Sequence, residues 1–199
     1  KAYCSDQGFN VSVDAVQVHG GYGFCTEYGI EQFIRDTKIA SIYEGTNGIQ
    51  AIDFVTRKIL KDKAHTFFEV GKKIKAAMEN EEAKEFSHEN SMIGKSMEMS
   101  EKVLAKFSEM AAKKNHNGIL SHATDFLDYC GNLVVAWQLL EHACLAKKKL
   151  AGEATEEEAK YYQSKIVDFK VFCQYQLVKN IGIGNSVLNF ENNLMELEL

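Results

Sequence analysis

Two glycine-containing segments, with a carboxylate at the start of the second, hold the residue types that could do chemistry. They are His19–Gly23 (HGGYG) and Glu44–Gly48 (EGTNG). Glycine leaves backbone N–H groups open to a ligand, and a carboxylate held rigidly beside them can take a proton from that ligand. Spacing alone also fits a plainer interpretation, in which Glu44 begins a helix and Gly20 and Gly21 form a turn between two helices.

No other set of residues offers a competing site. Gly20, Gly21 and Gly23 do not form the G-x-G-x-x-G fingerprint of dinucleotide-binding folds. A di-iron site would need Glu-x-x-His pairs on several helices, and the six histidines follow no such pattern, so we expect no metal. Cys25 and Ser41 have no base at a recognisable spacing, which argues against nucleophilic catalysis.

The composition indicates an all-α protein that binds neither nucleic acid nor membrane. The 199 residues contain no proline, the strongest helix breaker. A net charge of −5 does not suit a protein whose main task is to neutralise phosphates, and no apolar run is long enough to span a bilayer. The five cysteines are widely spaced and form no C-x-x-C pair, as expected in a reducing compartment, here the cytoplasm.

The spacing of apolar residues predicts three helices around the two glycine segments. The first ends near residue 18, and the second covers residues 27–42. The third begins after Glu44–Gly48, with Thr46 or Asn47 as its cap. The free N–H groups at its start favour an anionic or strongly polar ligand.

The second half of the chain predicts an antiparallel helical bundle. Residues 61–90 are rich in Lys and Glu, with one apolar face formed by Phe67, Phe68, Val70, Ile74 and Met78, and we expect a loop and a domain boundary around this range. The expected domains are 1–64 and 65–199. Amphipathic helices with short connections are predicted over residues 92–110, 126–144 and 162–177.

The ends of the last predicted helix carry local signals. Thr155 with Glu158 three residues later is a capping box, which marks its beginning. Gly182 and Gly184 are expected to end it. The tail to Leu199 then either frays or docks.

The two glycine segments form part of a longer pattern that resembles a known family. Its pieces follow in one order and at one spacing: Gln17–Phe24, Glu27-Tyr28, Arg35-Asp36 and Ile42–Gln50. This pattern resembles the C-terminal helical domain of the flavin-dependent acyl-CoA dehydrogenases. Residues 131–137 and 161–165 are similar to a further C-terminal helical domain in one bacterial branch, which includes the 3-methylmercaptopropionyl-CoA dehydrogenases.

The resemblance implies a reaction and a role for each site residue. Glu44 would remove the α-proton of an acyl-CoA thioester while hydride passes from Cβ to FAD, which leaves a trans double bond. Gly45 would lie beside the acyl chain of the substrate. The residues expected to contact FAD are Thr46, Asn47 and Gly48. The residues expected to approach an FAD held by a neighbouring subunit are Gln17, Val18, His19, Gly20 and Gly21.

The resemblance also implies partners and a larger protein. It implies a homo-oligomer, dimer or tetramer, and an electron-transfer flavoprotein as electron acceptor. The chain starts with Lys1 inside a helix already under way, and nothing in it resembles the family's N-terminal helical and middle β-domains. We therefore expect a fragment that is inactive by itself. Two alternatives stay open: a helical oligomerisation module without a catalytic role, and the DNA-associated branch of the same superfamily.

Overall fold

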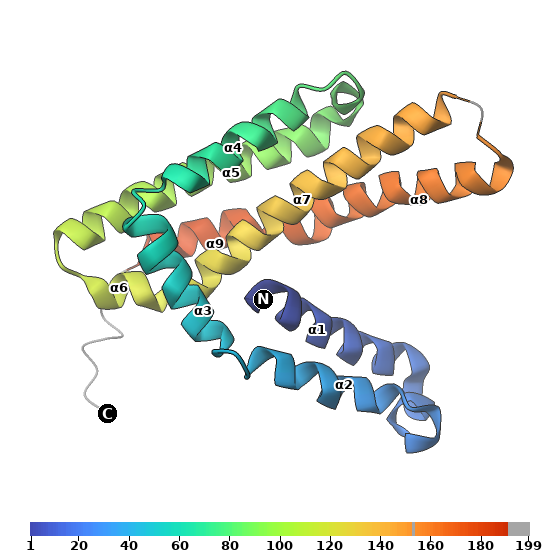
Figure 1. Cartoon of the computed structure of the whole chain (residues 1–199), viewed down its shortest axis with the longest axis horizontal. Coiled ribbons are helices and arrows are strands. Elements are labelled where there is room, and N and C mark those ends of the chain that lie inside the picture. The colour runs from blue at the N-terminus through green and yellow to red at the C-terminus, as the bar shows by residue number, and fades with distance from the viewer. Residues whose placement is uncertain (153, 191–199) are drawn as a thin grey trace.

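The computed structural model describes residues 1–152 and 154–190, and in this part of the chain every regular element is a helix (Figure 1). The all-α prediction is therefore confirmed. Without proline, no residue inside a helix lacks a backbone N–H donor. No helix in these ranges is long and apolar enough to cross a membrane.

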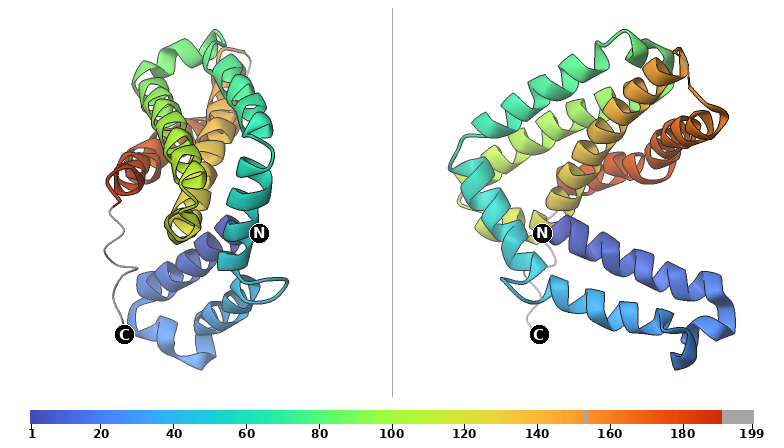
Figure 2. Two further views of the ribbon diagram at one scale, coloured as in Figure 1. Left: turned by 90° about the vertical axis from the view of Figure 1, so that its left-hand side faces the viewer. Right: turned by 45° about the vertical axis from the view of Figure 1, so that its right-hand side comes forward.

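The first two helices form an antiparallel hairpin that projects from the rest of the molecule (Figures 1 and 2). Helix α1 covers Ala2–His19 and ends, as predicted, at a glycine, Gly20, whose φ is +62°. Two short 3₁₀ turns, η1 (Gly20–Phe24) and η2 (Thr26–Tyr28), reverse the chain. The helix predicted over 27–42 is shorter: α2 covers Ile30–Lys38, because Gly29 is left-handed (φ +69°) and η3 (Ile39–Ser41) tightens its end.

After the Glu44 loop the chain forms one helical rod. Helix α3 (Asn47–Asp53) has Thr46 as its N-cap, one of the two predicted caps, and continues into the π-helical segment η4 (Phe54–Leu60). A turn then leads into α4 (His65–Met78). The loop predicted over 61–90 is wrong for most of that range, since α4 fills half of it and η5 (Glu82–Phe86) follows.

The main bundle contains the three predicted amphipathic helices. They are α5 (Ser87–Ala112), α7 (Ala123–Leu150) and α8 (Glu156–Phe172), and a short helix, α6 (His116–Ser121), connects the first two. The Thr155–Glu158 capping box is present at the start of α8. Helix α8 continues through the π-helical η6 (Cys173–Leu177) into α9 (Lys179–Leu188).

The prediction that Gly182 and Gly184 end the last helix is wrong. Helix α9 runs through both of them. Gly184 is buried, and the side chain of Met99 on α5 fills the space that a Cβ would need. The glycine therefore serves close packing of α9 against α5. The predicted fraying or docking of the tail concerns residues 191–199, which lie outside the described part of the chain.

The buried side chains form two clusters along the bundle. One centres on α5, α7 and α8, where Phe86 packs edge-on against Phe169. The other joins η4, α5 and α7, with Val55 and Ile59 packed in the same cluster as Phe126. The rod that follows the Glu44 loop is thus anchored in the core of the bundle.

Candidate active site

Glu44 lies on an exposed turn with an unusual backbone. Its φ is +55° and that of Gly45 is +80°, so two consecutive residues are left-handed. A non-glycine residue in this region is uncommon and is held there by its surroundings. The Gln50 side-chain Nε2 donates to the Glu44 carbonyl at 2.9 Å and would be 3.0 Å from a Cβ on Gly45. Glu44 is therefore an exposed residue on a turn that the Gln50 side chain holds by a hydrogen bond.

The side chain of Asn47 ties this turn to the start of α1. Its Nδ2 donates to the Ser5 hydroxyl at 2.9 Å and to the Ala2 carbonyl at 3.2 Å. Its Oδ1 accepts from the Lys1 ammonium at 2.7 Å, and the same ammonium donates to the Gly45 carbonyl at 2.8 Å. Asn47 is 8% exposed, so its carboxamide is a buried anchor.

The start of α1 is in turn tied to the bundle. The Tyr3 hydroxyl donates to Asn132 Oδ1 at 2.9 Å, and Asn132 Nδ2 donates to Asn180 Oδ1 at 3.0 Å. Asn180 Nδ2 then donates to the Ser96 hydroxyl at 2.8 Å. Burial, with a smaller contribution from the charge of Asp128, raises the pKa of Tyr3 to about 12, so the phenol stays protonated and can donate. A chain of hydrogen bonds thus connects the Glu44 turn, through α1, to α7, α9 and α5.

The residues expected to approach a cofactor held by a neighbouring subunit lie at the other end of α1. Gln17, Val18, His19, Gly20 and Gly21 are all exposed, and His19 Nδ1 lies 2.8 Å from the Ala15 carbonyl. Because the Glu44 turn contacts the first residues of α1, the length of that helix, about 25 Å at 1.5 Å per residue, separates the two groups (Figure 2). The structure does not bring them together within one chain.

The hairpin and the following turn expose many large apolar side chains. Val18 is 85% exposed and Phe24 is 82% exposed. The others are Val11, Val13, Tyr22, Tyr28, Phe33, Ile39, Ile42, Tyr43, Ile49 and Ile52. So many exposed apolar side chains on one hairpin are typical of a surface that contacts another protein or domain.

The backbone near both groups can be approached by a ligand. A Cβ at Gly20, Gly21 or Gly48 would meet no other atom within 4 Å. Peptide groups with such open space suit the close approach of a flat or extended cofactor such as a flavin nucleotide. In the described ranges, no group of three or more His, Cys, Asp or Glu side chains could hold a metal ion.

Comparison with known proteins decides the family. Residues 69–198 match the model described as "Acetyl-CoA dehydrogenase C-terminal like", and residues 1–60 match "Acyl-CoA dehydrogenase, C-terminal domain". The chain belongs to the acyl-CoA dehydrogenase family. The two matches follow each other along the chain, and the Glu44 turn lies inside the match to residues 1–60.

Individual relatives agree with this assignment. The chain is 34% identical over 201 residues to 3-methylmercaptopropionyl-CoA dehydrogenase of Ruegeria pomeroyi, and 29% identical over 204 residues to the broad-specificity linear acyl-CoA dehydrogenase FadE5 of Mycobacterium tuberculosis. Both alignments cover 100% of the chain. A butyryl-CoA dehydrogenase of Syntrophomonas wolfei is 32% identical over 86% of the chain. The chain spans about a third of the length of these acyl-CoA dehydrogenases, at 33%, 34% and 28%.

Sequence reasoning missed the anchors of the site. Nothing in the spacing showed that Asn47 would bond to Ser5 or that Tyr3 would reach Asn132. A partial signal existed for the second contact, because Gly131 sits in the middle of the long helix α7, where glycine is unfavourable unless a close neighbour requires it.

Proposed function

We propose that this chain is the C-terminal part of a flavin-dependent acyl-CoA dehydrogenase, with Glu44 as the catalytic base. The observation that carries the proposal is the fixed, exposed turn that presents the Glu44 carboxylate. The names of the relatives, all acyl-CoA dehydrogenases, support the substrate class. In this proposal domain 1–64 carries the catalytic base, and domain 65–199 is the additional helical bundle.

The turn would act as follows. Glu44 takes the α-proton of the acyl-CoA thioester, and its backbone N–H polarises the thioester carbonyl. Gly45 lets the acyl chain pass close to the backbone. When bound, FAD supplies the acceptor for the hydride from Cβ, so the product is the trans-2-enoyl-CoA.

Desolvation of the site would come from outside the chain. A carboxylate becomes a stronger base when water is excluded from it, whereas Glu44 is exposed here. The segments that cover the exposed apolar side chains around it would exclude that water. We therefore expect the 199-residue chain alone to oxidise no acyl-CoA when FAD and an electron acceptor are added.

Cofactor contacts follow from the same arrangement. Thr46, Gly48 and the backbone N–H of Asn47 would contact FAD, while the Asn47 carboxamide holds the turn against α1. Residues 17–21 lie one helix length from the Glu44 turn, too far to contact the same FAD end within one chain. This separation supports their contact with an FAD held by a neighbouring subunit. The parent protein would then be a homo-oligomer, dimer or tetramer, of the cytoplasm that passes electrons to an electron-transfer flavoprotein.

A Glu44→Gln variant of the full-length enzyme tests the proposal. The variant keeps the shape and loses the base, so turnover should fall by about 10³-fold while flavin absorbance stays unchanged. Glu98→Gln, at an exposed position on α5, is the matched control and should keep full turnover. Retained turnover in Glu44→Gln would refute the catalytic role. If the full-length protein bound no flavin, the alternative of a helical oligomerisation module would replace the proposal.

A further inference from the structure

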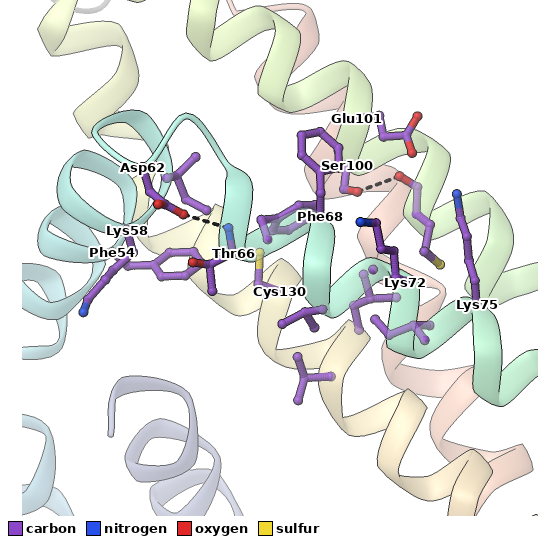
Figure 3. Close-up of a pocket in the computed structure, with 18 of the residues that line it drawn as sticks. Phe54, Lys58, Asp62, Thr66, Phe68, Lys72, Lys75, Ser100, Glu101 and Cys130 are labelled. Atoms are coloured by element: carbon purple, nitrogen blue, oxygen red, sulfur yellow. Dashed lines mark hydrogen bonds between the residues drawn. The ribbon is translucent and has the colours of Figure 1, made fainter.

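Helices η4, α4, α5 and α7 surround a cavity of about 810 Å³ (Figure 3). It lies between the two buried clusters of the bundle: Ile74, Met97 and Leu133 belong to one, and Phe54 and Ile59 pack with the other. The pocket is open to solvent on one side, where Phe68 and Val134 are exposed, and its volume falls in the range of small-molecule sites. The pocket therefore leaves room for a ligand between the two clusters.

The walls of the cavity are largely apolar. Figure 3 shows the rings of Phe54 and Phe68 and the thiol of Cys130 around the same space. Burial raises the pKa of the Cys130 thiol, so it stays neutral and adds no charge to the wall. Val70 and Val134 complete the apolar lining. Such a surface suits a hydrocarbon chain.

The rim of the cavity is basic, although the chain as a whole carries a net charge of −5. Its cations are Arg57, Lys58, Lys61, Lys72 and Lys75, and its acids are Asp62 and Glu101. The lining therefore holds three more basic than acidic side chains, and two of the basic ones, Arg57 and Lys72, are paired with carboxylates outside it. This local reversal of sign favours an anionic group at the mouth.

Several of these cations are available to a ligand. Arg57 pairs with Asp53 at 2.7 Å and Lys72 with Glu69 at 2.6 Å. Within residues 1–152 and 154–190, no carboxylate lies within ion-pair distance of Lys58, Lys61 or Lys75.

The backbone beside the cavity is irregular in two independent ways. Segment η4 is π-helical, with the Lys61 N–H bonded to the Thr56 carbonyl at 3.0 Å. The next turn holds Lys63 (φ +51°) and Ala64 (φ +57°), two consecutive left-handed residues without glycine. Wide helical turns and strained residues cluster at functional sites, where the strain shapes the site.

We propose that this cavity binds an amphipathic anion, with a linear acyl chain between the two buried clusters and its anionic head at the lysine rim. A free carboxylate and the phosphates of a CoA thioester share this chemistry. The site is separate from the proposed active site, since no residue of Glu44–Gly48 lines it. The proposal does not depend on the function proposed for Glu44.

Calorimetric titration of the 199-residue chain with four probes tests it. Decanoate and decanoyl-CoA carry both the chain and the charge, decanol carries the chain alone, and CoA carries the charge alone. Saturable binding of decanoate or decanoyl-CoA, at least about tenfold tighter than decanol or CoA, is expected. The tighter of the two identifies the source of the ligand. No saturable binding, or equal binding of decanol, would overturn the proposal.

Paired variants locate the binding. Lys75→Glu should weaken it by about tenfold through charge reversal, whereas Lys73→Glu, on the same helix but outside the lining, should change it less than twofold. Val134→Trp places a large side chain at a wall position that is 40% exposed and should abolish binding, while Val167→Trp on α8 should not. Circular dichroism checks that each variant is folded. Equal affinities within both pairs would overturn the assignment to this cavity.

Discussion

The ring of Tyr3 lies against the backbone of Gly131, so closely that a Cβ on Gly131 would overlap the ring. This contact brings α1 next to α7 and lets the Tyr3 hydroxyl reach Asn132 Oδ1 at 2.9 Å. Two residues far apart in the sequence thus fix the helix that anchors the Glu44 turn.

Gly131→Ala is expected to lower the free energy of unfolding by about 1–3 kcal/mol, because the methyl group overpacks the contact. Urea denaturation of the 199-residue chain measures it. Gly94→Ala, also inside a long helix, places its Cβ 3.9 Å from Met78 Cε and should be neutral or stabilising. In a Tyr3→Ala background the loss from Gly131→Ala should disappear. An undiminished loss there would show that the ring is not its cause.

The two glycines of α9 should respond in opposite directions to alanine. Gly182 has open space around its Cβ position, so Gly182→Ala should raise stability by up to about 1 kcal/mol through helix propensity. Gly184→Ala should lower it by about 1–3 kcal/mol, since its methyl group meets Met99. The two unfolding midpoints in urea give the comparison. Stabilisation by both substitutions would contradict the close packing of α9 on α5.

Asn47→Asp should loosen the Glu44 turn. Aspartate keeps the acceptor for Lys1 but has no donor, so the Ala2 carbonyl loses its bond to this side chain and faces a carboxylate instead. Amide hydrogen exchange over residues 44–48 should become faster by about tenfold, which corresponds to about 1.4 kcal/mol. Asn185→Asp, at an exposed site on α9, should leave that exchange unchanged.

The capping box of α8 predicts a pH dependence. The Thr155 backbone N–H donates to the Glu158 carboxylate at 2.9 Å, and the Thr155 hydroxyl donates to it at 2.8 Å. These two hydrogen bonds, the backbone one first, lower the pKa of Glu158 below its usual 4.5. A carboxyl group whose pKa is lower in the folded state adds stability above its unfolded pKa. That stability is lost as the pH falls through the folded pKa.

Glu158→Ala should therefore lower the thermal midpoint at pH 7, and its difference from the unsubstituted chain should shrink as the pH falls below 4.5. Thermal melts followed by circular dichroism at several pH values measure this. Glu157→Ala is the control, because it removes a carboxylate from the same first turn but not from the capping box. A deficit for Glu158→Ala that did not vary with pH would argue against the capping interaction.

Local signals in the sequence predicted most of the helices. The stop at Gly20, the cap at Thr46 and the capping box at Thr155 all depend on residues within a few positions of each other, so they could be identified without coordinates. The loop predicted over residues 61–90 is wrong because it also relied on local composition, which is mostly polar there. The many exposed charges on α4 and η5 outweighed the short apolar face that includes Ile74, although buried residues such as Ile74 and Phe86 are what hold these helices to the bundle.

The sequence by itself determined the helical class, the family pattern and the position of Glu44 next to a glycine, because periodicity, caps and motifs are properties of neighbouring residues. Only the tertiary structure decided that Asn47 faces α1, that the two glycine groups lie a helix length apart, and that a basic-rimmed cavity separates the two cores. These features arise from contacts such as that between Tyr3 and Asn132, 129 positions apart. Their geometry is set by how whole helices pack, which local spacing does not encode.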